Sequence, residues 1–479
     1  MSAGTRNQTS IEGGLYELVA RGEKDKYFIK DDKEAIHPFQ WTYDRWPASL
    51  PEERWTNPLN EPRFGQRCEF EFDLPGDVLM EATLVIDLPS WLDPVMAAAN
   101  PTSLTHVSGN VDHSYGYVNG IGYFLFEQIE IYQDNYQIQS VTGDSLYALQ
   151  LTKQNYNQGF LTQQLAGIHN GSTRAIMKNA TPGRIEIPVP MIGCSWPGDR
   201  GLPLCGLRSQ TFRLRLTLRP LEQLVESSVA SELHPAPWLK TFTQMQEDET
   251  FITLPAVPLA NIGQPTLYLR TKQLYLLNEA REQLAKEPIE VPYIRYFNNI
   301  FNLNQLDYSA IQRGGTSIVT KRVDAVYTVE RMVTYFRNTK EVIKNRLYNF
   351  KNELPTSTDG QFYSQLKLVI AGKDRESYWE PALWQNVVID AKEERSTSQN
   401  ICTMDWSRGW RIDDFPPSIR EPTGGINFTT ADRPQLNVVL TDAEQNPELG
   451  YIQVQMFTCC ESWALYRIRK GRGGLEYAN

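Results

Sequence analysis

The chain has 479 residues, of which 41% are hydrophobic and 22% are charged, and its formal net charge is −10. This composition is that of an ordinary globular protein, which excludes extensive disorder and collagen-like repeats, and the length predicts two packed domains. The negative charge argues against a coat that wraps nucleic acid directly, because neutralising phosphates needs a basic surface.

No run of about 18 apolar residues is present, so no membrane-spanning helix is predicted. The first residues, MSAGTRNQTSIEGG, lack an apolar signal region, which predicts a chain that stays out of the secretory route and folds in a reducing cytosol. In that setting, four N-x-S/T patterns are interpreted as chance matches: Asn7, Asn170, Asn179 and Asn427. Six cysteines without CxxC spacing predict buried free thiols: Cys68, Cys194, Cys205, Cys402, Cys459 and Cys460.

Alternating apolar and polar residues predict strands through the first half of the chain. The pattern is clearest in TFRLRLTLR (211–219), where the leucines fall on one face and the arginines on the other. EFEFDL (69–74) and RIEIPV (184–189) show the same period. FEQIEIYQDNYQIQSV (126–141) is typical of a hairpin that turns at Asp134-Asn135, and a helix is expected after Asp144.

An irregular stretch, rich in proline and acidic residues, covers residues 221–265. Strand pattern resumes at Thr266, and a short helix is expected after Asn278. Later strands are predicted in QLKLVI (365–370), QLNVVL (435–440) and YIQVQMF (451–457). Two polar stretches, 95–120 and 391–401, are interpreted as surface loops.

Many antiparallel strands with few helices must bury sheet against sheet, and a jelly roll needs somewhat under about 200 residues. We therefore predict an all-β chain of two tandem antiparallel jelly-roll barrels with a few short helices and long surface loops. The expected divisions are an amino-terminal arm (1–45), a first jelly roll (46–222), an inter-barrel linker (223–265), and a second jelly roll with a carboxyl-terminal tail (266–479).

Several segments resemble the double jelly-roll major capsid proteins of nucleocytoplasmic large DNA viruses. The similar segments, in the family's order, are residues 13–28 with 37–45 (the arm), 64–89, 185–219, 422–430 and 461–479. The run IEIPVPMIGCSWPGDRGLPLCGLRSQTFRLRLTLR is the most specific of them. One departure is DDKEAIHPFQW, which stands where the family has a Gly-Asn-Pro step before a Phe-Phe-Lys run.

The resemblance implies a structural subunit of an icosahedral shell. Three copies would form a pseudo-hexagonal trimeric capsomer that contacts neighbouring capsomers and minor capsid and penton proteins. An internal viral membrane would lie nearby without being spanned, and no direct contact with nucleic acid is expected. The protein would be made and assembled in the host cytoplasm and reside in the virion capsid.

The arm carries aromatic residues of the kind enriched at interfaces. They are candidates for contacts at the base of the subunit or with a neighbouring one, and packing into the chain's own first barrel is an equally open alternative: Tyr27, Phe28, Phe39, Trp41 and Tyr43.

No motif for enzymatic chemistry is found, and no catalytic residue, metal site or cofactor is predicted. The five histidines are scattered without metal-ligand spacing: His37, His106, His113, His169 and His234. The glycines of GYVNGIGYF (116–124) indicate a turn, because the third glycine of a dinucleotide-binding motif is missing. Cys459-Cys460 are expected to face opposite sides of a strand. The basic run Arg467, Arg469, Lys470 and Arg472 is interpreted as a solvated edge, with phosphate binding as the less favoured alternative.

Two other functions fit the same pattern. A scaffold or minor capsid subunit would share the double barrel. A carbohydrate-binding or carbohydrate-cleaving jelly-roll protein could use some of the 11 Trp and 23 Tyr residues to stack on sugars, although no signal region and no acid pair accompany them.

Overall fold

The computed structural model divides the chain into two compact units, residues 1–48 and 49–479, and describes parts of the second. For residues 104–106, 241–245 and 251–255 only the backbone is described. The described residues are 49–90, 104–106, 115–152, 166–168, 183–194, 201–207, 210–239, 241–245, 251–255, 257–286, 288–354, 360–375, 379–384, 400–407 and 424–476.

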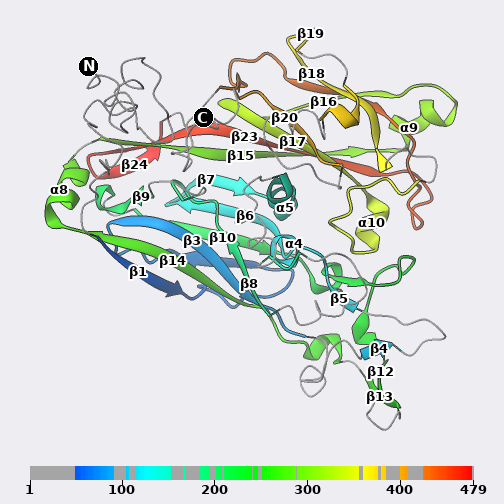
Figure 1. Cartoon of the computed structure of the whole chain (residues 1–479), viewed down its shortest axis with the longest axis horizontal. Coiled ribbons are helices and arrows are strands. Elements are labelled where there is room, and N and C mark those ends of the chain that lie inside the picture. The colour runs from blue at the N-terminus through cyan, green and yellow to red at the C-terminus, as the bar shows by residue number, and fades with distance from the viewer. Residues whose placement is uncertain are drawn as a thin grey trace, which may run out of the picture. The chain divides into compact units, whose positions relative to one another are not determined.

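The first sandwich consists of two antiparallel sheets that share one hydrophobic core (Figure 1). One sheet has the order β1 (Ser49–Thr56), β14 (Thr266–Leu276), β3 (Val78–Asp87) and β8 (Arg184–Pro188), with β9 (Leu202–Pro203) also paired to β3. The other has the order β2 (Arg67–Glu71), β10 (Phe212–Leu218), β6 (Phe126–Gln133) and β7 (Tyr136–Val141).

Strand β10 shows why these residues form a sandwich. Its side chains alternate strictly between buried and half-buried, and Leu214 and Leu216 are fully buried. The strand lies between β2 and β6, with Leu216 opposite Cys68 on one side and Ile129 on the other. The predicted β6–β7 hairpin is confirmed, and Asp134 adopts the left-handed conformation (φ 50°) at its turn.

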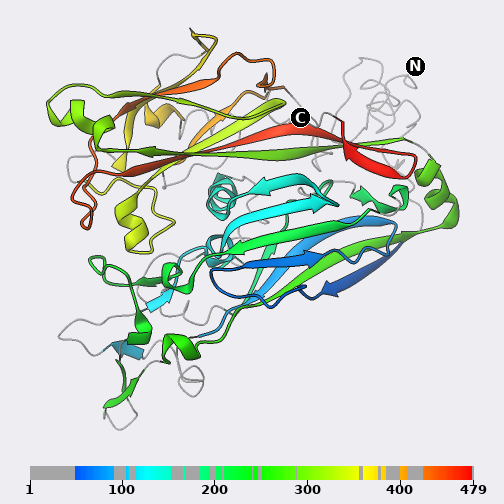
Figure 2. The same ribbon diagram turned by 180° about the vertical axis from the view of Figure 1, so that it is seen from behind.

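The second sandwich also has two antiparallel sheets around a core of its own. The sheet that contains β23 has the order β15 (Ile289–Leu303), β23 (Val454–Arg469), β17 (Thr328–Asn338) and β20 (Cys402–Asp405), with β21 (Ile426–Asn427) on β17 and β24 (Arg472–Leu475) on β23. The facing sheet has the order β16 (Ile318–Arg322), β22 (Gln435–Leu440), β18 (Tyr363–Ile370) and β19 (Lys373–Asp374). Figure 2 shows both from behind.

The change from one sandwich to the other comes later than the sequence pattern suggested. The second jelly roll was expected to begin at Thr266, yet β14 starts there and pairs with β1 and β3 in the first sandwich. The chain then passes through α8 (Asn278–Lys286) to β15. Alternation predicts that a segment is a strand, but it does not identify the neighbours of that strand, which explains the difference.

The helices are few and short. The predicted helices after Asp144 and Asn278 are confirmed as α5 (Gly143–Thr152) and α8. The other described helical segments include α4 (Ile121–Phe124), α9 (Gln305–Gln312), α10 (Thr339–Ile343), η2 (Leu204–Gly206), η3 (Leu221–Gln223), η4 (Pro237–Leu239) and η5 (Leu259–Asn261). None of the described helices is long and apolar enough to cross a membrane.

Short strands occupy parts of the expected loop and linker regions. The pair β5 (Tyr115–Tyr117) and β11 (Val225–Ser227) is buried, so the loop expected over residues 95–120 does not stay at the surface throughout. A small sheet joins β13 (Phe251–Pro255), β12 (Thr241–Met245) and β4 (Leu104–His106). The prediction of an all-β chain with two tandem sandwiches and few helices is confirmed.

The alternation in β10 gives a direct test of the core. Leu216→Ala should lower the free energy of unfolding by about 2–5 kcal/mol, because the lost side chain leaves a cavity that the sheets fill only partly. Thr217→Ala, the next residue on the opposite and partly exposed face, is the matched control and should cost much less. Chemical denaturation measures both, and equal losses would contradict the assigned faces.

Candidate functional site

The five aromatic residues that the sequence analysis selected as arm contacts lie outside the described residues. Their role stays a prediction: Tyr27, Phe28, Phe39, Trp41 and Tyr43.

The histidines form no metal site in the described part of the chain, where no cluster of three or more His, Cys, Asp or Glu side chains has metal-binding geometry. His234 is exposed, and its Nε2 lies 2.7 Å from a carboxylate oxygen of Glu448. His106 belongs to β4, of which only the backbone is described, and the other three histidines lie outside the described residues.

All six cysteines are thiols outside disulfide bonds, and four of them are fully buried. Burial raises the pKa of the Cys68 thiol to about 12, which keeps it protonated and unreactive. The neighbours Cys459 and Cys460 also have raised pKa values because of burial. Cys459 contributes to the core that includes the first sandwich and Cys460 to the core of the second, so the prediction that they face opposite sides of a strand is confirmed.

That division of Cys459 from Cys460 identifies the junction between the two sandwiches. The β23 sheet has one face in the core of the second sandwich, while its other face packs against α5 and the edge strand β7 of the first sandwich. In Figure 1, β15 and β23 run between α5 and β7 on one side and β16 and β18 on the other. A sheet buried on both faces must satisfy every charge it carries within the protein.

The most highly charged contact at the junction is centred on Asp144 in α5. One carboxylate oxygen accepts a hydrogen bond from Arg337 of β17 at 2.6 Å, and the other accepts one from Arg219, the residue after β10. Burial by itself raises the pKa of Asp144, but the positive charges of Arg219 and Arg337 outweigh it, so the net pKa is lowered. Asp144 is therefore ionised, and it binds one arginine from each sandwich.

A second buried pair lies further along the same sheet. Arg331 of β17 donates through Nε to the carboxylate of Glu461 in β23, and both side chains are almost completely buried. The guanidinium also lies 3.5 Å from the hydroxyl of Thr152, the last residue of α5. This pair thus connects two strands of the second sandwich with the helix of the first.

Side-chain amides bind backbone groups across the junction. Gln139 of β7 donates to the carbonyl of Ile294 at 2.8 Å and accepts from the backbone N–H of Tyr296 at 3.0 Å, in the way a neighbouring strand would. Asn345 donates to the carbonyls of Glu222 and Val225 at 2.6 and 2.7 Å. The edge of β15 and the segment after β10 are therefore held in a fixed register.

Aromatic rings fill the space beside these polar contacts. Phe350 lies 6.1 Å from Tyr147 of α5 and 4.5 Å from Tyr335 of β17, measured between ring centroids. Tyr335 in turn stacks on Phe457 of β23 at 4.9 Å. The junction therefore combines apolar packing with fully enclosed ion pairs, as the interior of a single domain does.

The junction residues were not predicted from the sequence. Arg331 and Arg337 lie in TVERMVTYFRN (328–338), which has buried side chains at almost every position and so lacks the alternation that marks a half-exposed strand. Charged residues inside such a strand are a usable signal, because they are rarely buried without a partner.

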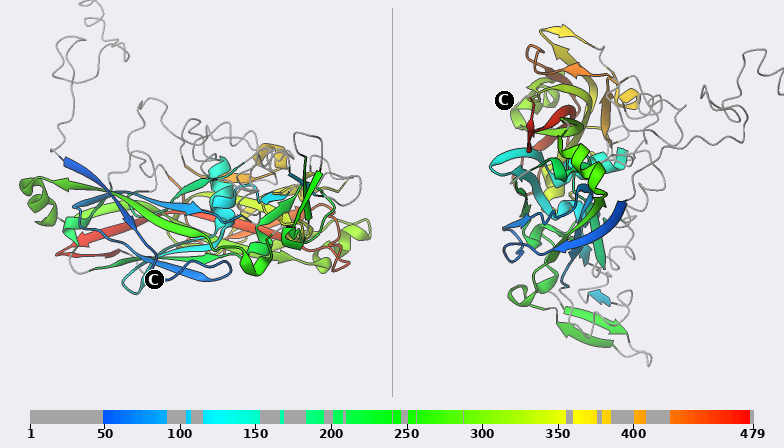
Figure 3. Two further views of the ribbon diagram at one scale, coloured as in Figure 1. Left: turned by 90° about the horizontal axis from the view of Figure 1, so that it is seen from below. Right: turned by 90° about the vertical axis from the view of Figure 1, so that its left-hand side faces the viewer.

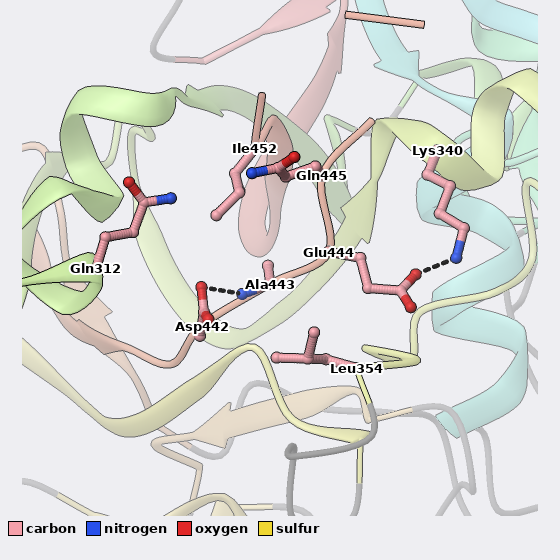
Figure 4. A pocket seen from close by; sticks show the side chains of 8 residues that line it. All are labelled: Gln312, Lys340, Leu354, Asp442, Ala443, Glu444, Gln445 and Ile452. Atoms are coloured by element: carbon pink, nitrogen blue, oxygen red, sulfur yellow. Dashed lines mark hydrogen bonds and ion pairs between the residues drawn. The ribbon is translucent and has the colours of Figure 1, made fainter. Parts of the chain in front are cut away.

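One pocket of about 430 Å³ lies in the second sandwich, lined by the end of α9, by α10 and by the segment after β22 (Figure 4). The Glu444 carboxylate accepts a hydrogen bond from Lys340, and the Asp442 carboxylate accepts one from the backbone of Ala443. Both acids are therefore engaged within the chain and provide no chemical argument for an enzyme site. The residues that line it are Gln312, Lys340, Leu354, Asp442, Ala443, Glu444, Gln445 and Ile452.

The Asp144 contact gives a test of the junction. Asp144→Asn removes the negative charge that lies between Arg219 and Arg337 and should lower the free energy of unfolding by about 3–5 kcal/mol, because the two guanidinium groups lose this counter-charge. Asp324→Asn is the control, since Asp324 pairs with Arg322 at the surface and should change stability little. Equal effects in denaturation would contradict the role given to Asp144.

The same residue predicts how the stability depends on acid. Because the folded pKa of Asp144 is lowered, its contribution is fully present above its unfolded pKa, near 3.8, and is lost as the pH falls through the lower, folded value. The stability difference between the native chain and Asp144→Asn should therefore be constant near neutral pH and shrink only below about pH 4. A difference that already shrinks at pH 6 would contradict this assignment.

Comparison with known proteins adds to this geometry. No protein-family model matches the chain, and no curated protein matches its sequence. Several solved structures match the chain in fold.

One is PBCV-1 VP54, fitted into a reconstruction of the virophage Sputnik, which is 15% identical with a TM-score of 0.65. The match covers 92% of this chain and 100% of that one. The Faustovirus major capsid protein has 8% identity and a TM-score of 0.63 (97% and 100% covered), and the mavirus major capsid protein 9% and 0.50 (94% and 96%). The chain therefore has the double jelly-roll fold of these viral major capsid proteins.

Proposed function

We propose that this chain is a major capsid protein, a structural subunit of an icosahedral virus shell. The observation that carries the proposal is the extent of the fold similarity, which covers both sandwiches and nearly the whole length of both chains compared. A protein with a single jelly roll would match these structures over only one of their two sandwiches.

The proposed activity is assembly. Three copies would form a pseudo-hexagonal capsomer, which would contact neighbouring capsomers in the virion capsid. Minor capsid and penton proteins would be further partners, with an internal membrane nearby that the chain does not span and no direct contact with nucleic acid. Synthesis and assembly would take place in the host cytoplasm.

The junction supports this proposal physically. A shell tile must keep its shape, and contacts between domains of one chain are by default loose enough to permit relative motion unless they are large and apolar. Here the junction encloses Asp144 and Glu461 with their arginine partners and packs Phe350 between two rings. A subunit with such a junction can present fixed flanks to its neighbours, and assembly in this form needs no enzymatic step.

The mass of the native particle in solution tests the proposal. Multi-angle light scattering of the purified full chain should give about three times the chain mass of 54.9 kDa, independent of concentration over the range measured. A stable monomer that binds glycans on an array would overturn the proposal in favour of a carbohydrate-binding protein.

The fraction of the protein in purified virions separates a major subunit from a scaffold or minor subunit of the same fold. A major capsid protein should be the dominant band on a denaturing gel of mature particles. Disappearance of the chain on maturation would instead identify a scaffold.

A further inference from the structure

The hairpin formed by β23 and β24 concentrates positive charge at one end of the described structure. Arg469, Lys470 and Arg472 are all exposed, and Lys470 and Gly471 form the turn with positive φ angles of 51° and 81°. Within the described residues, none of the three cations has a carboxylate at ion-pair distance, whereas the preceding Arg467 pairs with both Glu290 and Glu476. In the described part of the chain, the basic run thus separates into one arginine with two carboxylate partners and three cations that form no ion pair.

Two of these cations oppose each other. Arg469 and Arg472 are directly paired across the hairpin, with Lys470 between them in the turn. Like charges at facing positions of a strand pair are destabilising, and the chain as a whole is acidic. An anion bound at the tip would relieve this repulsion.

The hairpin is also held in place. Gln210 accepts a hydrogen bond from the backbone N–H of Gly473 at 2.7 Å and donates to its carbonyl at 3.2 Å, and Gln133 donates to the same carbonyl at 3.0 Å. A Cβ at Gly473 would overlap the hydroxyl of Tyr466, so this position needs glycine. The cations therefore project from a fixed support on the first sandwich.

Exposed apolar side chains lie at the same end. Tyr136, 78% exposed, begins β7 opposite Gln133, which binds the hairpin. Leu50 and Leu277 are 67% and 59% exposed, where β1 begins and β14 ends. Figure 3 shows β24, α8 and the start of β1 at one end of the long axis.

The acidic groups at this end are mostly engaged. Asp134 accepts hydrogen bonds from Thr211, and Asp77 pairs with Arg281. Glu282 pairs with Lys286 on α8, and Glu279 in the first turn of that helix remains as an exposed acid. Among the described residues, the hairpin tip therefore presents its three cations without an ion-pair partner, although the whole chain is negative.

We propose that this end of the molecule binds an anionic lipid bilayer through the three hairpin cations, with Tyr136, Leu50 and Leu277 entering the headgroup region. Cations attract anionic headgroups, and aromatic and aliphatic side chains gain by leaving water at the interface. A nucleic acid would use the cations but give Leu50 and Leu277 no apolar surroundings, so the side chains favour lipid. This inference names a partner for the proposed capsid subunit and rests on that proposal for its biological setting.

Co-sedimentation with vesicles tests the inference on the purified full chain. Vesicles of phosphatidylcholine with about one third phosphatidylserine should bind at low salt, and pure phosphatidylcholine should bind far less. The variant R469Q/K470Q/R472Q should lose on the order of a hundred-fold in partitioning, because each cation near the surface contributes about five-fold. The control K321Q/K373Q/R375Q removes the same charge from one partly exposed and two exposed positions in and next to the facing sheet of the second sandwich and should keep most of the binding.

Further variants distinguish binding to lipid from binding to other anions. The variant Y136S/L277S should weaken vesicle binding several-fold and leave the retention of short duplex DNA unchanged. If the hairpin variant loses DNA and vesicle binding alike while Y136S/L277S loses neither, the site recognises phosphate in general and the lipid assignment fails. Equal losses in the hairpin and control variants would likewise overturn it.

Measuring the particle mass of each variant distinguishes a failure of lipid binding from a failure of the proposed trimer. The hairpin variant should have the same particle mass as the unmodified chain and a melting temperature at least as high, because its changed side chains are exposed and the repulsion between Arg469 and Arg472 is removed. A monomeric unmodified chain that still binds anionic vesicles through the hairpin would refute the capsomer while supporting the lipid site.

Discussion

The two-sided burial of the β23 sheet is the constraint on which the rest of the structure depends. Most antiparallel sheets in a sandwich have one face exposed to solvent. In this sheet one face packs in the core of the second sandwich and the other packs in the junction. Cys459 and Cys460, adjacent in sequence, face different cores for that reason. Any charge on the junction face has to find its counter-charge on the other sandwich or on a neighbouring strand, and Asp144 with Arg337, and Glu461 with Arg331, meet that condition.

These ion pairs matter more for specificity than for net stability. Taking two charges out of water costs about as much as their attraction returns, so an apolar junction of the same shape could be equally stable. An apolar junction could also slide, whereas Asp144 accepts bonds from two directions and Gln139 matches the backbone of β15 at one register only. For the proposed capsid subunit a fixed junction matters, because a subunit that flexes at its centre would not present constant flanks to its neighbours.

The sequence pattern predicted the strands that have one buried face and one face exposed to solvent. In β10 the alternation of leucine and arginine reports both the strand and its buried side, and the β6–β7 turn residues mark the hairpin. Strand β17 shows no alternation of apolar and polar residues, because both of its faces are buried. The partners of Arg331 and Arg337 lie 130 and 193 residues away in the sequence, so a local pattern could not predict these ion pairs. The assignment of β14 to the second barrel failed for a related reason, since pairing with β1 and β3 is a long-range property that a local pattern does not contain.

The contrast between the junction and the β23–β24 hairpin shows how position decides what a charge can do. An arginine at the junction cannot be left without a partner, because burying an unpaired guanidinium would cost more than the stability of an ordinary domain allows. At the hairpin tip, water compensates Arg469, Lys470 and Arg472, so the repulsion between facing arginines is tolerable. Because the hairpin is held in place, these cations stay close together and favour the binding of an anion. Tyr136, Leu50 and Leu277 are exposed at the same end, so an anionic lipid surface matches this end better than phosphate alone.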